Sequence, residues 1–401
     1  MHQEQSLIAT LAICIALAFG CGMLATRLRL PALVGYLLAG IIAGPFTPGV
    51  TADAEIAPQL AEIGVMLLMF GVGTHFSLKD LMAVKGIAIP GALAQIAAAT
   101  ALGMGVAHWW GWSLGGGLVF GLALSVASTV VLLRALEQQG NLESEDGRIA
   151  VGWLIVEDLA MVLALVLLPV LAGALGGESG GAGHAGGAEM WKTLGLTLGK
   201  VALFVALMLV VGSRVFPWIL QRVARTDSRE LFTLAAIALA LGVAYASSRL
   251  FDVSVALGAF FAGMVINGSE LSHRAAGYLQ PLQDAFAALF FVAVGMLFDP
   301  MVLVQHPWQV LAVVAIIILG KSLVALLIVL LLRRPLGTAL TVSAALAQIG
   351  EFSFILAVMG VELKLLPPVG QSLILAGALL SITFNHLIFK LAMRFRPIPV
   401  G

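Results

Sequence analysis

The sequence predicts an all-α polytopic membrane protein with thirteen transmembrane helices, arranged as inverted repeats of six helices joined by a linking helix. Three observations lead to this prediction: an apolar composition, a series of apolar runs divided by short breaks, and an internal repeat. Of the 401 residues, 61% are hydrophobic and 10% are charged, whereas soluble domains carry about 25% charged residues. The formal net charge is zero and no basic run is present, so we expect membrane lipid around the chain and no nucleic-acid partner.

The apolar runs are separated by short stretches that contain charged residues, Gly or Pro, and these stretches mark the helix ends. The first run, 6–26, follows Glu4 and precedes Arg27 and Arg29. A secretory signal peptide carries its positive charge before the apolar run, so we expect this helix to be retained. The thirteen predicted spans are 6–26, 32–49, 56–74, 84–109, 113–137, 148–173, 191–221, 229–250, 254–270, 281–298, 307–333, 336–361 and 369–394.

The distribution of lysine and arginine predicts how the chain crosses the membrane. With the N-terminus outside, fifteen of these residues fall on the side that contains Arg27 and Arg29, and three (Lys192, Arg249 and Lys364) fall on the other. Cytoplasmic loops are enriched in positive charge. We therefore expect the N-terminus outside the cell and the C-terminus in the cytoplasm.

Two short patterns recur at a spacing of 222–223 residues, which predicts an internal repeat. Gly35, Ala39 and Gly40 recur as Gly258, Ala262 and Gly263, and Val72, Gly73, Phe76 and Leu81 recur as Val294, Gly295, Phe298 and Leu303. A linking helix between two six-helix repeats inverts the second repeat in the membrane. Inverted repeats are typical of secondary transporters, which bind their substrate near the midplane. Chance resemblance among Gly-rich and Ala-rich helices is the alternative.

The repeat predicts how the chain is divided. The predicted parts are 1–173 for the first repeat (helices 1–6), 174–228 for an external Gly-rich linker and the linking helix, and 229–401 for the second repeat (helices 8–13), with no soluble regulatory domain.

Two adjacent acids interrupt the predicted helix 148–173. Glu157 lies nine residues after Arg148, which places it and Asp158 roughly 15 Å along the helix, near the middle of the bilayer. A charge at this depth costs about 2.5–3.5 kcal/mol on insertion scales, and such residues are typical of ion pathways. We therefore interpret Glu157 and Asp158 as the ion site of a transporter.

Polar residues also interrupt two other apolar spans at equivalent positions. The repeat spacing pairs Ser128 and Thr129 with Gly350 and Glu351. Gly and polar residues inside apolar spans are typical of discontinuous helices, whose unwound segments expose backbone dipoles. Ser128 and Thr129 either ligate a cation or pack and hydrogen-bond between helices. Gln348, at the second presumed break, has the same two alternatives.

Glu351 and Lys321 are two further charges at mid-membrane depth. We expect Glu351 to compensate the positive N-terminal ends of the broken helices, with direct cation binding as the alternative. Lys321 requires an acidic partner. Asp158 is the first choice and Glu157 or Glu351 the next, and a purely structural ion pair is the alternative.

The charges of this candidate site do not balance, because three acids face one base. A low-dielectric site does not retain such an excess, so we expect it to take up protons or a cation. Competition between a proton and an alkali cation for one carboxylate couples their exchange. Glu62 and Gln95 are weaker candidate ligands, and an ordinary interfacial acid is the alternative for Glu62.

Neither an enzyme nor a resident metal site is expected from the sequence. The histidines and the two cysteines lack the spacing of metal ligands. No nucleophile and base are paired in a way that predicts catalysis. The expected metal is therefore limited to the transported alkali cation, and no cofactor is expected in the chain.

Several segments together resemble a known family. They are LPALVGYLLAGIIAGP, AEIGVMLLMFGVG, SVASTVVLLRAL, GWLIVEDLAMV, ALGAFFAGMVI, FFVAVGM and QIGEFSFIL, together with Lys321. As a set they resemble the monovalent cation:proton antiporter-2 family, above all its Kef-type branch of glutathione-regulated potassium-efflux-like membrane domains. The resemblance covers essentially the whole chain. It implies a sodium/proton antiporter-like fold with crossed discontinuous helices, a dimerisation domain, a mobile core domain with elevator-like alternating access, and a homodimer in the bacterial inner membrane.

The resemblance also implies roles for single residues. Asp158 is similar to the family's essential cation-binding and proton-binding aspartate. Ser128 and Thr129 lie at its first helix break, Glu351 at its second, and Lys321 at its intramembrane basic position.

Two departures from the family pattern leave questions open. Glu157 stands where Kef-type proteins have Gln and where sodium/proton exchangers have Asn or Asp, so cation preference and stoichiometry stay open. Kef-type proteins usually carry a cytoplasmic nucleotide-binding regulatory domain after the last helix, whereas this chain ends at Gly401. It is therefore either a naturally short homologue or a truncated one.

The sequence thus predicts a secondary active transporter that exchanges a monovalent cation, K⁺ first and Na⁺ second, for protons. Asp158 is the expected shared site of the cation and the proton. The alternative is a gated potassium channel-like efflux protein on the same fold.

Overall fold

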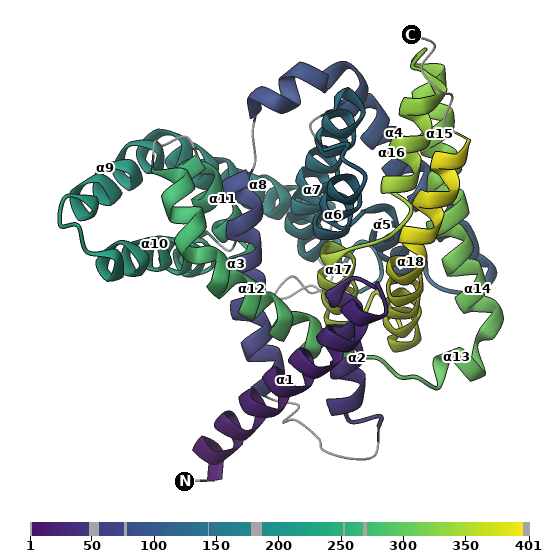
Figure 1. The fold of residues 1–401 in the computed structure, drawn as a ribbon, viewed down its shortest axis with the longest axis horizontal. Helices are drawn as coiled ribbons and strands as arrows, with labels where there is room; N and C mark the ends of the chain where they lie inside the picture. The colour runs from purple at the N-terminus through teal and green to yellow at the C-terminus, as the bar shows by residue number, and fades with distance from the viewer. Residues whose placement is uncertain are drawn as a thin grey trace. The chain divides into compact units, whose positions relative to one another are not determined.

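A computed structural model describes residues 2–47, 56–75, 78–142, 144–177, 187–251, 253–267 and 271–395, and the regular structure in these ranges is helical (Figure 1). The centre of the predicted Gly-rich linker, 178–186, and the C-terminal residues 396–401 lie outside the described residues.

Among the described residues, eight helices are long and apolar enough to cross a membrane. They are Leu7–Arg27, Leu81–Trp109, Glu145–Leu171, Gly199–Ala224, Arg229–Phe251, Arg274–Met296, Pro307–Leu331 and Pro368–Arg394. Shorter apolar helices are Ala32–Ala43, Glu62–Thr74, Leu114–Ser125, Val255–Asn267 and Leu336–Ala345. The predicted all-α polytopic membrane fold is confirmed, and the count of thirteen spans stays a prediction.

The chain divides into two compact units. The first unit comprises Met1–Cys21, Tyr36–Ser77 and His184–Met296, and the second comprises Gly22–Gly35, Leu78–Gly183 and Leu297–Gly401. Each unit therefore combines residues from both predicted repeats. The division into repeats itself stays a prediction.

Helices of the first unit, some shared with the second at their ends, are α1 (His2–Arg27), α2 (Ala32–Ala43), α3 (Ile56–His75), α8 (Gly187–Leu207), the π-helical turn η1 (Met208–Gly212), α9 (Ser213–Ala224), α10 (Arg229–Phe251), α11 (Val255–Asn267) and α12 (Ser272–Met296). Within this unit α3 packs against both α11 and α12 (Figure 1).

Glycines allow helices of the first unit to approach until backbone meets backbone. A Cβ on Gly73 would collide with the Phe260 carbonyl oxygen, and one on Gly263 would collide with the Phe70 carbonyl oxygen. Small residues at such contacts are typical of membrane helix packing.

A second reciprocal contact joins α2 to α12. A Cβ on Gly40 would meet the backbone of Gly295, and one on Gly295 would meet the backbone of Gly40 at 3.0 Å. The repeat spacing pairs Gly40 with Gly263 and Gly73 with Gly295. The contact between α2 and α12 in one arrangement therefore corresponds to the contact between α11 and α3 in the other. A two-fold relation between the repeats predicts this correspondence.

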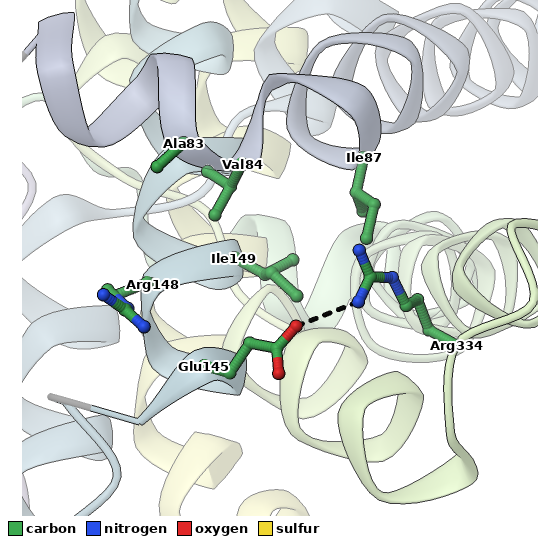
Figure 2. Close-up of a pocket in the computed structure, with 7 residues that line it drawn as sticks. All are labelled: Ala83, Val84, Ile87, Glu145, Arg148, Ile149 and Arg334. Carbon is green, nitrogen blue, oxygen red and sulfur yellow. Dashed lines mark hydrogen bonds and ion pairs between the residues drawn. The ribbon is translucent and has the colours of Figure 1, made fainter.

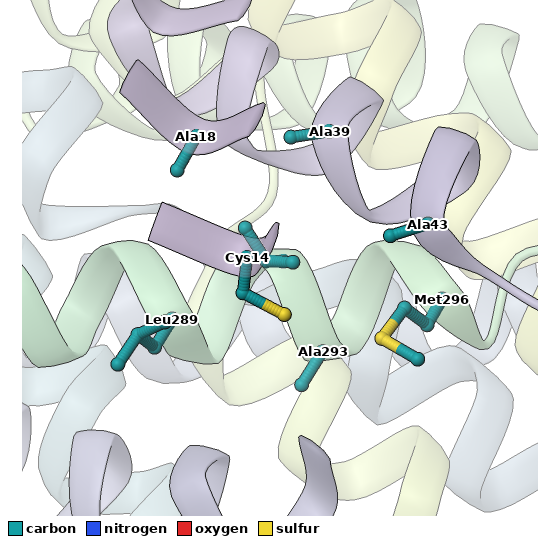
Figure 3. Packing of buried hydrophobic residues seen from close by; sticks show 8 residues of the cluster. Cys14, Ala18, Ala39, Ala43, Leu289, Ala293 and Met296 are labelled. Atoms are coloured by element: carbon teal, nitrogen blue, oxygen red, sulfur yellow. The ribbon is translucent and has the colours of Figure 1, made fainter. Parts of the chain in front are cut away.

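Small side chains likewise line the contact of α1 and α2 with α12 (Figure 3). The buried cluster consists of Cys14, Ala18, Ala39, Ala43, Leu289, Val292, Ala293 and Met296. Cys14 and Cys21 are free cysteines. Cys14 lies within this cluster and Cys21 packs against it, which agrees with apolar packing for both.

The second unit contains α4 (Leu78–Trp109), α5 (Leu114–Ser125), α6 (Thr129–Gln138), α7 (Glu145–Leu171), α13 (Val302–Gln305), α14 (Pro307–Ala315), the π-helical turn η2 (Ile316–Gly320), α15 (Lys321–Leu331), α16 (Leu336–Ala345), α17 (Glu351–Glu362) and α18 (Pro368–Arg394). Here α4 packs against α5 and α7, while α16 packs against α15 and α18.

Two predicted spans of the second unit are interrupted near their middle. Residues 126–128 are extended between α5 and α6, and 346–350 are non-helical between α16 and α17. Ser128 is the N-cap of α6, and its hydroxyl accepts a hydrogen bond from the Val131 N–H at 3.4 Å. A side chain that caps a helix start stabilises such an interruption.

Three helices have bounds that differ from the prediction. The helix predicted over 84–109 begins at Leu78, and the one predicted over 281–298 begins at Ser272 and contains Pro281. The helix predicted over 32–49 ends at Ala43, because Gly44 and Pro45 follow it.

Candidate ion-binding site

The two helix breaks of the second unit meet in a cluster of polar side chains. The cluster contains Gln95 on α4, Ser128 and Thr129 at the start of α6, Glu157 and Asp158 on α7, Lys321 on α15, Gln348 in the second break and Glu351 at the start of α17. All are buried except Thr129, which is half-buried. The structure thus brings together every residue predicted for the site that belongs to the second unit.

Glu62 lies on α3 of the first unit, and its side chain is exposed. An exposed acid requires no buried partner. The exposure agrees with the interfacial alternative, and a ligand role for Glu62 stays a prediction.

The side chain of Gln348 ties the two breaks together. Its Oε1 accepts a hydrogen bond from the Ser128 N–H at 2.9 Å, and its Nε2 donates to the Ser128 carbonyl at 3.2 Å. The same Nε2 donates to the Ala345 carbonyl at 3.3 Å. Unwound backbone in an apolar protein must find partners, and this one amide satisfies both polar groups of Ser128.

Gly350 permits the breaks to cross closely. A Cβ at this position would lie 2.7 Å from the Ser128 Cβ and would also collide with the Ser128 backbone. The requirement at Gly350 is for space, since its φ of −134° is open to other residues.

Glu157 holds the first break from the side of α7. One carboxylate oxygen accepts a hydrogen bond from Gln95 Nε2 at 2.6 Å, and the other accepts one from the Ala127 N–H at 2.9 Å. Gln95 Nε2 also donates to the Ser125 carbonyl at 3.3 Å. Both oxygens of Glu157 are therefore engaged, and its carboxylate satisfies a backbone donor that the break exposes.

Lys321 lies at the second break, directly after the π-helical turn η2. Its ammonium donates to the Gln348 carbonyl at 2.9 Å. The acid whose charge acts on it is Glu157, which the sequence ranked after Asp158 as partner. Glu157, Lys321 and Gln348 thus link α7 to both breaks.

Asp158 is bound less completely than its neighbour. Its Oδ2 accepts a hydrogen bond from the Thr129 hydroxyl at 3.2 Å. Its Oδ1 is buried and has no hydrogen-bond partner among the described residues. The negative charges of Glu351 and Glu157 act on this carboxylate, so like charges are concentrated on a group with few donors.

Glu351 lies between the N-termini of two helices. It is the first residue of α17 and faces Ser128 and Thr129 at the start of α6. The positive ends of both helix dipoles favour a negative charge there. In the described part of the chain, however, neither carboxylate oxygen completes a hydrogen bond.

The cluster offers oxygen atoms suited to an alkali cation. Asp158 Oδ1 and both Glu351 oxygens are buried and complete no hydrogen bond with the described residues, so they are free to accept a proton or to bind a cation. Hard cations prefer carboxylate, hydroxyl and carbonyl oxygens. The described residues contain no group of three or more His, Cys, Asp or Glu that could hold a resident metal ion.

Two functional contacts were not recognised in the sequence. Backbone groups of Ser125 and Ala127 take part in the site, and no sequence pattern indicates this. Asn385 on α18 is buried and donates to the Ala344 carbonyl at 3.1 Å, directly before the second break. The sequence does show an amide, Asn385, inside the apolar span 369–394, and a polar residue in such a span indicates a hydrogen bond to a neighbouring helix.

One end of α7 is joined to the start of α16 (Figure 2). Arg334 Nη1 donates to Glu145 Oε1 at 2.9 Å, beside a cavity of about 180 Å³ lined by Ala83, Val84, Ile87, Arg148 and Ile149 as well. The Thr338 hydroxyl donates to buried Asp146 at 2.6 Å. The helix that carries the acids is therefore attached to the helix that leads to the second break.

The chain is similar to known proteins over nearly its whole length. The family description "Sodium/hydrogen exchanger, transmembrane" matches residues 14–394. The putative cation/proton antiporter YbaL of Escherichia coli (strain K12) is 61% identical over 395 residues, which are 98% of this chain and 70% of that protein. K(+) efflux antiporter 4 of Arabidopsis thaliana is 34% identical over 382 residues, which are 95% of this chain and 62% of that protein.

A solved structure has the same fold. The sodium proton antiporter MjNhaP1 from Methanocaldococcus jannaschii at pH 8 superposes with a TM-score of 0.75, covering 99% of this chain and 100% of that one. The sequence identity is 17%, so the comparison concerns the fold alone, and the predicted sodium/proton antiporter-like fold is confirmed.

Proposed function

This chain belongs to the sodium/hydrogen exchanger family, whose members are transporters rather than enzymes, and from that premise we propose that it exchanges a monovalent cation for protons. K⁺ is the first choice of cation, since relatives are named K(+) efflux antiporters, and Na⁺ is the second. The proposed location is a bacterial inner membrane, with the N-terminus outside.

The observation that carries this proposal is the unequal bonding of the neighbouring acids. Both oxygens of Glu157 accept hydrogen bonds, whereas Asp158 Oδ1 and both Glu351 oxygens have no partner among the described residues. Buried carboxylate oxygens of this kind bind either a proton or a cation. Asp158 is therefore the proposed shared site.

The exchange follows from charge balance. When a cation binds, Asp158 is ionised and ligates it together with the Thr129 hydroxyl and a Glu351 oxygen. When the cation leaves, Asp158 takes up a proton, because three neighbouring acids would otherwise face Lys321 alone in a low-dielectric site. A given Asp158 holds a proton or a cation but not both, and this competition couples the two movements.

Glu157 has a different proposed role from Asp158. Its hydrogen bonds to Gln95 and Ala127 and its charge interaction with Lys321 occupy the carboxylate. We propose that Glu157 stabilises the conformation of the first break. Only one carboxyl, that of Asp158, then exchanges a proton for a cation in each cycle.

Alternating exposure of the site completes the proposal. We propose an elevator-like movement of a core domain that carries the two broken helices, within a homodimer. Gln348 supports this, because its hydrogen bonds to Ser128 make the two breaks move together.

The proposal is tested by proton flux in proteoliposomes that contain a trapped pH dye. Imposed K⁺ and Na⁺ gradients are expected to drive proton movement in the native protein, and Asp158→Asn is expected to reduce it to that of empty liposomes. Asp146→Asn is the matched control on the same helix, because an amide oxygen still accepts the Thr338 hydrogen bond. Persistent cation-driven proton flux in Asp158→Asn would refute the assignment of Asp158.

The same measurement separates an antiporter from a gated channel. A channel would conduct K⁺ without coupled proton movement, so the dye signal would follow only the membrane potential. With a permeant anion such as thiocyanate holding that potential near zero, an antiporter still moves protons in response to a K⁺ or Na⁺ gradient, whereas a channel does not.

A further inference from the structure

A cavity of about 490 Å³ lies in the second unit, apart from the polar cluster. Its walls come from the connection between α1 and α2, from α6 and from α18. A cavity of this size accommodates a small molecule or part of a lipid.

The polar part of the wall is suited to an anion. Arg29 and His386 line the cavity together with the amides of Gln139 and Asn385, and none of the described lining residues is an acid. Within the described part of the chain, Arg29 has no acidic partner. Guanidinium and amide donors are the groups that bind phosphate oxygens.

The remaining wall is apolar and lies at the end of membrane-spanning helices. Leu33, Ile382 and Phe389 contribute to it. Arg29 follows the last turn of the apolar span Leu7–Arg27, where lipid headgroups begin. A wall that combines basic and apolar residues matches a phospholipid better than a free phosphate.

We propose that this cavity binds the phosphate group of an anionic phospholipid, with an acyl chain against its apolar wall. Basic pockets between membrane helices are suited to anionic headgroups on physical grounds. The binding itself does not depend on the proposed exchange function, whereas its effect on exchange does.

The cavity is lined by α6 of the first broken pair and, through Asn385 of α18, is one hydrogen bond from the second break, so its occupancy bears on the polar cluster. Val131 of α6 lines the cavity, and its N–H bonds to the Ser128 hydroxyl at the first break. Asn385 lines it as well and donates to the Ala344 carbonyl just before the second break. A lipid that holds Asn385 and α6 in place therefore stabilises the arrangement of both breaks.

Native mass spectrometry of the purified full chain tests the binding. Phosphatidylglycerol is expected to bind more strongly than phosphatidylcholine, and the double variant Arg29→Gln, His386→Gln is expected to weaken phosphatidylglycerol binding roughly five- to tenfold. Arg333→Gln is the matched control, because Arg333 also ends a helix with positive φ (58° against 62° at Arg29), is exposed, and does not line the cavity.

The outcomes separate the sources of the phosphate. An equal loss of binding in Arg333→Gln, or no loss in the double variant, would overturn the proposal. Displacement of phosphatidylglycerol by millimolar glycerol phosphate would overturn the lipid assignment in favour of a soluble phosphate compound. Because no ion gradient is used, these results do not depend on whether the chain exchanges cations for protons.

Discussion

Glu157 and Asp158 are neighbours in the sequence, yet their carboxylates have different surroundings. Successive residues on a helix point about 100° apart, so Glu157 faces Gln95 and Ala127 while Asp158 faces Thr129. The first acid is held by two donors and the second by one. This difference supports separate roles for two residues that composition alone treats as equivalent.

Replacement of Glu157 is expected to reduce stability more than it alters coupling. In Glu157→Gln one of the two accepted hydrogen bonds is lost, and Lys321 is left as a buried charge without its acidic partner. A buried charge that loses its compensating charge destabilises the folded state. We expect a lower unfolding temperature in detergent, with cation-driven proton flux still measurable in protein that is folded.

A double variant supplies the control. In Glu157→Gln, Lys321→Gln the buried ammonium is removed together with the acid whose charge acts on it. The amide introduced in place of the ammonium can still donate to the Gln348 carbonyl, so we expect part of the lost thermal stability to return. Equal unfolding temperatures for the single and double variants would contradict a charge interaction between Glu157 and Lys321. Loss of all exchange in folded Glu157→Gln would contradict the role assigned to Glu157.

At the residue scale, the sequence revealed charges but not their partners. Glu157, Asp158, Lys321 and Glu351 were recognisable because a charge deep in an apolar span is rare. The interaction of Lys321 with Glu157 depends on how α7 and α15 are rotated, which a single sequence does not specify. The repeat spacing placed Glu351 beside a helix break, and the structure shows that its carboxylate lies at two helix N-termini.

The crossing of the two breaks is the feature that matters most at the scale of helices. Repeat spacing paired Ser128 with Gly350, and in the structure these two residues are in contact. The pairing predicted where each helix is interrupted. It did not predict the hydrogen bonds of Gln348, since these depend on the distance between the broken segments.

Gly350→Ala is expected to disrupt this crossing. The added methyl group would collide with the backbone and Cβ of Ser128, and overpacking of this kind costs about 1–3 kcal/mol. We expect a lower unfolding temperature and a loss of cation-driven proton flux, because Ser128 and Thr129 would be displaced from Asp158. Differential scanning fluorimetry and the dye assay measure the two effects.

Gly105→Ala is the control for this substitution. Gly105 lies on α4 of the same unit, and a Cβ there would have no neighbour within 4 Å. Alanine at such a helix position is expected to stabilise slightly. If Gly350→Ala behaved like Gly105→Ala, the close approach at the crossing would not be required.

Two interruptions of a different kind were not predicted. The spans 191–221 and 307–333 contain the π-helical turns Met208–Gly212 and Ile316–Gly320. A single inserted residue changes a helix locally without changing its apolar composition, so hydropathy does not reveal it. The second turn directly precedes Lys321, and therefore affects the direction in which this ammonium points.

For the whole molecule, composition and motifs were sufficient to predict class and family. The matches to antiporters and K(+) efflux antiporters confirm the resemblance to Kef-type membrane domains. The family resemblance implies two domains, but the residues that make up each compact unit were not predicted, because each unit is assembled from segments of both halves. Such an arrangement depends on contacts between residues that are far apart in the sequence, and a single sequence does not reveal these contacts.

Membrane orientation is the prediction that belongs to the whole chain. In a variant with Cys14 and Cys21 replaced by Ser, we expect Asp227→Cys to be protected from a membrane-impermeant maleimide in intact cells, and Lys364→Cys to be labelled. Both positions are exposed in turns with positive φ, so they are matched in accessibility. The reverse labelling would contradict the proposed N-terminus outside and C-terminus inside.

The attachment of α7 to α16 limits how these two helices can shift against each other. Its buried Asp146–Thr338 bond is the stronger contact, since an exposed pair such as Glu145–Arg334 contributes at most about 1 kcal/mol. Asp158 lies twelve residues further along α7, roughly 18 Å from this attachment. Because this end of α7 is attached to α16, the two helices can move relative to each other mainly by tilting about the attachment. Over that length of helix, a tilt of about 5° would move the Asp158 carboxylate by about 1.5 Å. Such a small angle is enough to make or break a bond between an oxygen and an ion.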